Sequence, residues 1–96
     1  MEKKIRIDQF LDDEGRIKQL PRKLTAKLAV LEHLTEKFEM GRFYSEREVN
    51  EICDLWHTFG DYFLIRRELV DCNLLARERD GSRYWRVWEK PDDDTE

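Results

Sequence analysis

The dipeptide Asp80-Gly81 is the feature that most narrows the fold, because it separates two short runs, Leu74–Arg79 and Ser82–Trp88. Asp-Gly readily supplies the positive φ angles that a two-residue hairpin turn demands. Short runs on either side of such a turn are typical of paired β-strands. The sequence therefore predicts a β-hairpin that turns at Asp80-Gly81.

Two helical patterns come directly before the predicted hairpin. The first helix is predicted over Glu46–His57, and Ser45 and Glu48 have the spacing of a capping box at its start. The second helix is predicted over Tyr62–Cys72, after a tight connection that contains a glycine. Two residues of that connection are candidate N-caps: Thr58 and Asp61. Two short helices joined in this way form a helix-turn-helix.

Apolar residues also recur with helical spacing over Leu24–Phe38, and Gly41 is suited to be the C′ residue that ends this helix. The segment Arg16–Leu20 alternates polar and apolar residues and stops at Pro21, as a short edge strand would. Strand, three helices and hairpin, in this order, are the winged-helix topology. The expected fold class is α+β and winged-helix-like, with a C-terminal β-hairpin wing and a short N-terminal strand.

The length and the net charge of the chain further limit its number of domains and its possible functions. Its 96 residues allow one hydrophobic core, and we expect one winged-helix-like domain over residues 1–90. The net charge of −4 is carried entirely by residues 91–96, which we expect to form a disordered acidic tail. The folded body is then neutral, which counts against a dedicated nucleic-acid binder, because such proteins usually carry a basic excess.

The sequence also bears on location. No stretch approaches the ~20 consecutive apolar residues of a membrane span, and the N-terminus leads into no apolar signal region. We therefore expect a cytoplasmic protein with no membrane partner. Cys53 and Cys72 occupy apolar positions of two predicted helices, where a free cysteine behaves as a small hydrophobe. A disulfide is not expected.

Individual residues, as well as the order of the elements, match a known family. They are Gly15, Ile17, Pro21, Phe43–Ile52, Asp61, Ile65–Asp71, Leu74, Leu75, Arg77 and Ser82–Arg86. This set spans most of the chain and resembles the prokaryotic domain-of-unknown-function 2087 family. Members of that family occur alone or joined to helix-turn-helix regulators, so the resemblance implies an association with transcription. It implies no catalytic or ligand-binding residues.

The sequence contains no clear set of catalytic residues. His33 and His57 lie on different predicted helices, no Gly-rich phosphate loop is present, and the carboxylates stand among lysines and arginines. Cys53 and His57 are four residues apart, but the paired short spacing of a zinc site is absent. We therefore expect a non-enzymatic protein with no metal and no cofactor.

The third predicted helix carries mixed charges. Helical projection places Tyr62, Ile65, Leu69 and Cys72 toward the core, and Leu64, Arg67, Glu68 and Asp71 outward. Two acidic residues on the outward face disfavour base readout in a major groove. Arg66 falls within the apolar face, so it either contacts a phosphate or partner, or forms an internal ion pair with Glu46 or Glu48. The internal pair is favoured because buried charges are usually paired.

The hairpin offers the best candidate surface for contact with nucleic acid. A two-residue turn pairs Arg79 with Ser82, Arg77 with Tyr84 and Leu75 with Arg86 on one face. The other face, with Leu74, Ala76, Trp85 and Val87, is then expected to pack on the helices. A three-residue turn with Gly81 in a bulge would shift these pairs by one. The predicted nucleic-acid contacts are Arg67, Arg77, Arg79, Tyr84 and Arg86.

Two functions follow from these observations. The leading hypothesis is a non-enzymatic winged-helix module, associated with transcription, that touches DNA weakly through the wing. The alternative is a protein-interaction module that binds a transcriptional regulator or a second copy of itself. A continuous positive stripe from the wing to the third helix would favour DNA, whereas a mosaic of charges with an exposed apolar patch would favour a protein partner.

Overall fold

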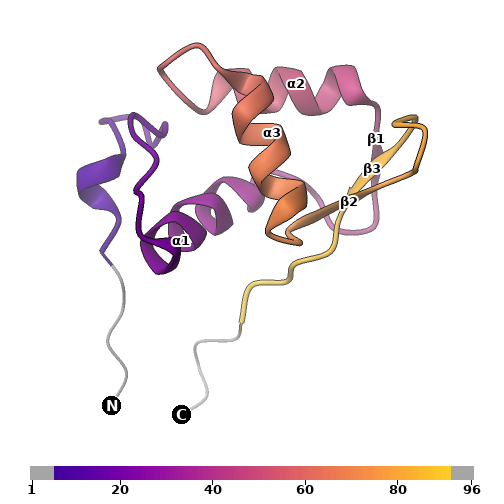
Figure 1. The fold of residues 1–96 in the computed structure, drawn as a ribbon. Helices are drawn as coiled ribbons and strands as arrows, with labels where there is room; N and C mark the ends of the chain where they lie inside the picture. The colour runs from indigo at the N-terminus through magenta and orange to yellow at the C-terminus, as the bar shows by residue number, and fades with distance from the viewer. Residues whose placement is uncertain (1–5, 92–96) are drawn as a thin grey trace.

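The structure is a computed structural model that describes residues 6–91. Within this range three α-helices stand with a small sheet at one end of the molecule, and α3 crosses from α2 toward the sheet (Figure 1). The elements are η1 (Asp8–Phe10), α1 (Leu24–Thr35), β1 (Phe43–Tyr44), α2 (Glu46–Leu55), α3 (Tyr62–Asp71), β2 (Leu75–Arg77) and β3 (Tyr84–Arg86). The predicted α+β, winged-helix-like fold is confirmed.

The helices match the predicted ranges closely, except at the end of α1. This helix ends at Thr35 rather than Phe38, because the amides of Lys37 and Phe38 bond back by three residues, to Leu34 and Thr35. These bonds tighten the chain and bring the Phe38 ring against Tyr44, with ring centroids 5.1 Å apart. Phe38 therefore enters the core from outside the helix.

The first strand lies elsewhere than predicted. Residues 16–20 do not form a strand, and within this segment only Ile17 pairs, through single bridges to Leu11 and His57. The antiparallel sheet has the order β1-β3-β2, so the place beside β3 is taken by Phe43–Tyr44. With that place filled, Ile17 instead packs, fully buried, against the junction of α2 and α3.

The core lies between the helices and one face of the sheet. Its buried apolar residues are Ile17, Val30, Leu31, Leu34, Phe38, Tyr44, Val49, Cys53, Ile65, Leu69, Leu74, Leu75 and Tyr84. Two residues of the apolar helical patterns lie at the surface instead: Leu24 and Tyr62 are 64% and 41% exposed. Both begin a helix, where the first turn projects past the core.

Local capping decides where α2 and α3 begin. The Glu48 amide donates to Ser45 Oγ at 3.1 Å and the Ser45 amide donates to Glu48 Oε1 at 2.8 Å, so the predicted capping box is formed. Of the two candidate caps for α3, Asp61 is the one used, since its Oδ1 accepts from the Leu64 amide at 3.1 Å.

A buried histidine joins these two helices. The Nδ1 atom of His57 lies 2.7 Å from the Cys53 carbonyl oxygen, and its Nε2 atom lies 2.7 Å from the Asp61 amide. Because a carbonyl only accepts and an amide only donates, Nδ1 carries the proton and Nε2 accepts. The neutral ring therefore connects the end of α2 to the cap of α3.

The hairpin has the predicted register but a different turn. Leu75 pairs with Arg86, and Arg77 with Tyr84. The turn is closed by a bond from the Gly81 amide to the Glu78 carbonyl, and Gly81 has φ +77° whereas Asp80 does not have a positive φ. The two-residue turn is therefore wrong, because Asp80 instead uses its carboxylate to hold the Ser82 amide at 2.9 Å.

Leu74 is buried as predicted, but between β2 and β3 the hairpin packs on the opposite face from the one predicted. Leu75 and Tyr84 are buried, whereas Trp85 is half-buried beside the exposed Phe43 and Val87 is 44% exposed. Tyr84 faces the core because its β1 partner, Tyr44, is already there. The face that carries Arg77, Tyr84 and Arg86 is thus the inner one.

No helix within residues 6–91 has both the length and the apolar character to cross a bilayer. The acidic tail was predicted over residues 91–96, and all but its first residue lie outside the described part of the chain.

Candidate nucleic-acid interface

An open groove of about 320 Å³ separates α3 from the hairpin. It is the only place where the structure brings together sequence-predicted contacts from both the helix-turn-helix and the wing, within residues 6–91. Its lining comprises Glu46, Phe63, Arg66, Arg67, Val70, Asp71, Arg77 and Tyr84. The groove therefore carries three arginines and two carboxylates.

Arg66 forms the floor of this groove. Its side chain is only 13% exposed, and its guanidinium lies 3.0 Å from a carboxylate oxygen of Glu46 and donates to the side-chain oxygen of Asn50. The guanidinium also lies over the Phe63 ring, 5.1 Å from its centroid. The predicted internal ion pair between α2 and α3 is confirmed, with Glu46 as the partner.

Arg67 stands on the outward face of α3. Its side chain is 67% exposed, and its Nε lies 3.9 Å from the Asp71 carboxylate one turn further along the helix. Such an exposed pair is weak and is exchanged readily for another anion. Glu68, the other outward carboxylate, is held by Lys27 of α1 at 3.2 Å. Arg67 is thus available to a phosphate at little cost.

Arg77 reaches the groove from the end of β2. It is exposed, its guanidinium lies 6.0 Å from the Tyr84 ring centroid, and its Nη2 donates to the Arg79 carbonyl at 3.3 Å. A Cβ atom placed on Gly81 would lie 3.5 Å from a Glu46 carboxylate oxygen. The hairpin tip therefore lies close to the start of α2.

The other three predicted contacts are Arg79, Tyr84 and Arg86, and only Tyr84 lines the groove. Arg79 is exposed at the turn, but Tyr84 is 3% exposed and lies at the back of the groove. Arg86 is half-buried and donates to the carbonyls of Phe38 and Trp88, at 2.8 Å each. Of the five predicted residues, three are therefore exposed to solvent and accessible to nucleic acid: Arg67, Arg77 and Arg79.

Phe63 is a groove residue that we did not predict. This residue is 52% exposed, and its ring lies against the guanidinium of Arg66. Its position in the first turn of α3 could have predicted this exposure, because that turn extends beyond the neighbouring helices.

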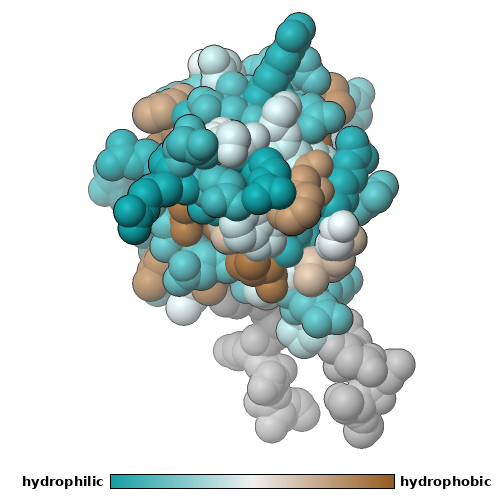
Figure 2. Space-filling model, turned by 90° about the vertical axis from the view of Figure 1, so that its right-hand side faces the viewer, coloured by the Kyte–Doolittle hydropathy of each residue, from teal (hydrophilic) through white to brown (hydrophobic). Residues whose placement is uncertain are grey.

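The outer face of the sheet differs from the groove. Phe43 and Trp85, opposite each other on β1 and β3, form an edge-to-face pair with centroids 5.7 Å apart. Arg83 lies over the Phe43 ring at 4.5 Å and pairs with Glu78 at 2.7 Å. A shallow pocket of about 390 Å³ on this face is lined by Gly41, Arg42, Phe43, Glu78 and Trp85. The sheet end of the molecule is mainly hydrophilic, with hydrophobic residues scattered over it (Figure 2).

Neither cysteine has the lowered pKa of a reactive thiol. Burial raises the pKa of the Cys53 thiol to about 12 and also raises the pKa of Cys72, so both thiols are protonated at neutral pH. Among the described residues, no three histidine, cysteine or acidic side chains gather in a way that could hold a metal ion.

Comparison with known proteins gives one match. A family model described as "Uncharacterized protein conserved in bacteria (DUF2087)" matches residues 16–86. No curated protein and no solved structure matches the chain. The matched range takes in all of α1, α2, α3 and the sheet, and therefore the whole groove between α3 and the hairpin.

Proposed function

The chain belongs to the DUF2087 family of uncharacterized bacterial proteins, and we propose that it is a non-enzymatic winged-helix module that contacts DNA phosphates in transcription control. One observation carries this proposal: Arg67 and Arg77, from different elements, line one open groove beside the exposed Arg79. Arginines on a helix and an adjacent wing can reach phosphates on either side of a groove of duplex DNA.

The contact is expected to be weak and to read little sequence. Asp71 and Glu46 stand among the arginines, and carboxylates are repelled by phosphates. On the outward face of α3, Arg67 is the one long cationic donor, whereas base readout uses several such donors or amides. The groove thus suits a module that adds phosphate contacts to recognition supplied elsewhere.

Binding to a short labelled duplex, followed by fluorescence anisotropy across a salt series, tests this proposal. The variant Arg67→Ala, Arg77→Ala, Arg79→Ala should weaken binding to all sequences alike and reduce the salt slope by about two to three, because each phosphate contact contributes about 0.9. The matched control is Lys18→Ala, Arg22→Ala, Lys23→Ala, which removes the same charge from exposed positions outside the groove.

The control should retain most of the wild-type slope. Equal losses in both variants would show that binding follows overall charge and would reject the groove as the contact. No association at low salt, even after removal of residues 92–96 with their four carboxylates, would reject DNA binding by this chain.

A second candidate function is self-association through the outer face of the sheet. Phe43 is 56% exposed and pairs with Trp85, and the groove proposal gives these aromatic residues no role. Exposed aromatic residues ringed by charges are typical of protein contacts. Sedimentation equilibrium of the wild type and Phe43→Ser tests it: a dimer lost in the variant supports self-association, and a monomer in both rejects it.

A further inference from the structure

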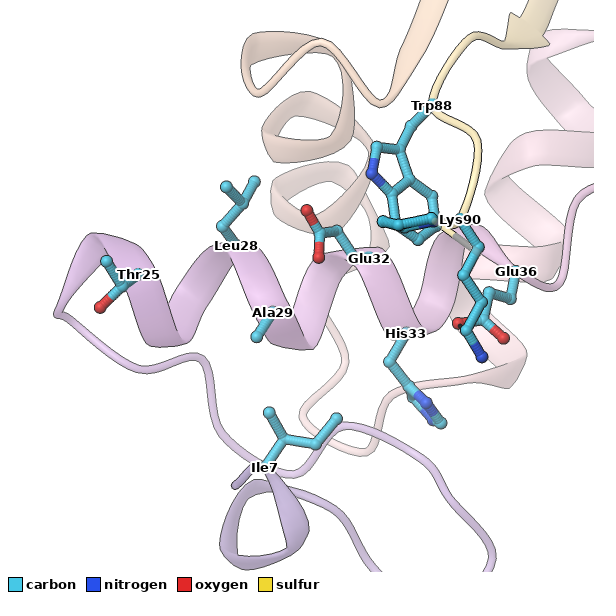
Figure 3. Close-up of a pocket in the computed structure, with 10 residues that line it drawn as sticks. Ile7, Thr25, Leu28, Ala29, Glu32, His33, Glu36, Trp88 and Lys90 are labelled. Carbon is cyan, nitrogen blue, oxygen red and sulfur yellow. Dashed lines mark ion pairs between the residues drawn. The ribbon is translucent and has the colours of Figure 1, made fainter. Parts of the chain in front are cut away.

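A second, larger groove runs along the exposed side of α1, away from the hairpin. It has a volume of about 610 Å³ and lies between the segment that contains Ile7 and the segment that contains Trp88 (Figure 3). It shares no lining residue with the groove between α3 and the hairpin. Its volume lies within the range of pockets that bind small molecules.

Apolar groups form the walls of this groove. Leu28 lines it from α1, Ile7 from the N-terminal segment and the Trp88 indole from the chain after β3. All three are partly buried and pack against the core, so they are held in place while one side of each faces the groove. A flat apolar ligand would therefore meet a preformed surface.

Glu32 of α1 contributes a carboxylate to this groove. In Figure 3 the Glu32 carboxylate lies between Leu28 and Trp88, and among the described residues it has no ion pair or hydrogen bond. Burial and the neighbouring Glu36 raise the pKa of Glu32. Both causes disfavour the charged form of this carboxylate.

The other ionisable groups in the groove are already engaged. Lys90 reaches Glu36, with 3.7 Å between Nζ and a carboxylate oxygen, and His33 Nε2 lies 3.3 Å from the Gly15 carbonyl oxygen. Within residues 6–91, an ammonium, that of Lys90, lies beside Glu36, and none pairs with Glu32. A second ammonium at Glu32 would relieve the repulsion between these two carboxylates.

We propose that the groove along α1 binds a small organic cation, a primary amine carried on a flat apolar body, with its ammonium at Glu32 and its body against Trp88 and Leu28. A carboxylate supplies the charge, and an indole face favours a cation close to it. Anions are disfavoured by Glu32 and Glu36. This inference does not rest on DNA contact and would stand if that contact were disproved.

Benzylamine is the probe, with benzyl alcohol and benzoate as neutral and anionic controls that keep the same ring. Each is titrated into the full chain, and binding is followed by amide chemical shifts in NMR spectra. Benzylamine should bind saturably and shift amides of residues 25–36 and 88–90, with an affinity about tenfold above that of benzyl alcohol. Benzoate should bind most weakly. Equal binding of all three, or shifts confined to other residues, would overturn the proposal.

Three variants locate the site. Glu32→Gln should reduce benzylamine affinity about tenfold and leave benzyl alcohol unchanged, because it removes only the charge. Lys90→Ala should strengthen benzylamine binding, since it removes the ammonium that pairs with Glu36 and makes the groove more negative. Glu51→Gln, an exposed site on α2, should change nothing. These surface changes leave the core intact, so wild-type benzylamine affinity in a folded Glu32→Gln protein would refute the assignment.

Discussion

The two faces of the hairpin contain the same kinds of residue but have opposite roles. On the inner face Tyr84 is 3% exposed and completes the core, whereas the adjacent Trp85, on the outer face, is only half-buried against Phe43. Each face also holds an arginine. Arg86 bonds to two backbone carbonyls on the inner face, and Arg83 pairs with Glu78 on the outer face.

This comparison shows that hydropathy alone did not choose the buried face. Arginine is tolerated on the inner face because its guanidinium donates to two backbone carbonyls there. Tryptophan is tolerated on the outer face because a neighbouring aromatic ring covers part of it. Packing partners, rather than the composition of each face, decided the orientation.

The largest expected effect comes from the adjacent aromatic pair. Tyr84→Ala should lower the free energy of unfolding by about 3 to 4 kcal/mol, as for other large aromatic residues removed from a core. Trp85→Ala should lower it by about 1 kcal/mol, because its ring is only partly removed from water. Urea denaturation measures both values. A larger loss for Trp85→Ala than for Tyr84→Ala would show that the assignment of the faces is reversed.

A smaller difference is expected between the two arginines. Arg86→Met should cost about 2 kcal/mol, because it leaves the carbonyls of Phe38 and Trp88 without their charged donor. Arg83→Met removes an ion pair that is about half exposed and should cost less than about 0.5 kcal/mol. The same denaturation experiment compares them, and equal costs would contradict a specific role for Arg86 on the inner face.

The smallest effect concerns the turn that sets the register of both faces. A bond from the Ser82 amide lowers the pKa of Asp80, so the ionised form is favoured in the folded state. Because the folded pKa is lowered, this contribution is present above the unfolded value of about 3.9 and is lost as pH falls through the folded value. Carboxyl NMR titration should place the Asp80 midpoint below that of the unfolded chain. A midpoint at or above the unfolded value would show that the bond is absent.

Features that close within a few residues were predicted well. Ser45 and Glu48 cap each other three residues apart, Asp61 caps the helix that it precedes, and the hairpin register follows from the two runs that flank the turn. Arg66 was also placed correctly, since helical periodicity puts it on a buried face where a charge requires a partner.

Features that depend on distant segments were missed. Arg16–Leu20 has the alternation of a strand, but Phe43–Tyr44 holds the place beside β3. Tyr84 and Arg86 were expected at the surface, yet they face the core and its border. The groove along α1 left no signal in the sequence, because its walls come from residues that are about eighty positions apart, Ile7 and Trp88.

The sequence by itself determined the α+β class, the order of the helices and hairpin, the start of each helix in the helix-turn-helix, and the register of β2 against β3. These depend on hydrogen bonds and periodicities within one element or one turn, which the chain encodes locally. Only the tertiary structure decided which strand borders β3, which hairpin face is buried and which arginines share the groove with α3. Those outcomes depend on competition between remote segments for one core, and alternation along a strand is the same whichever face is buried.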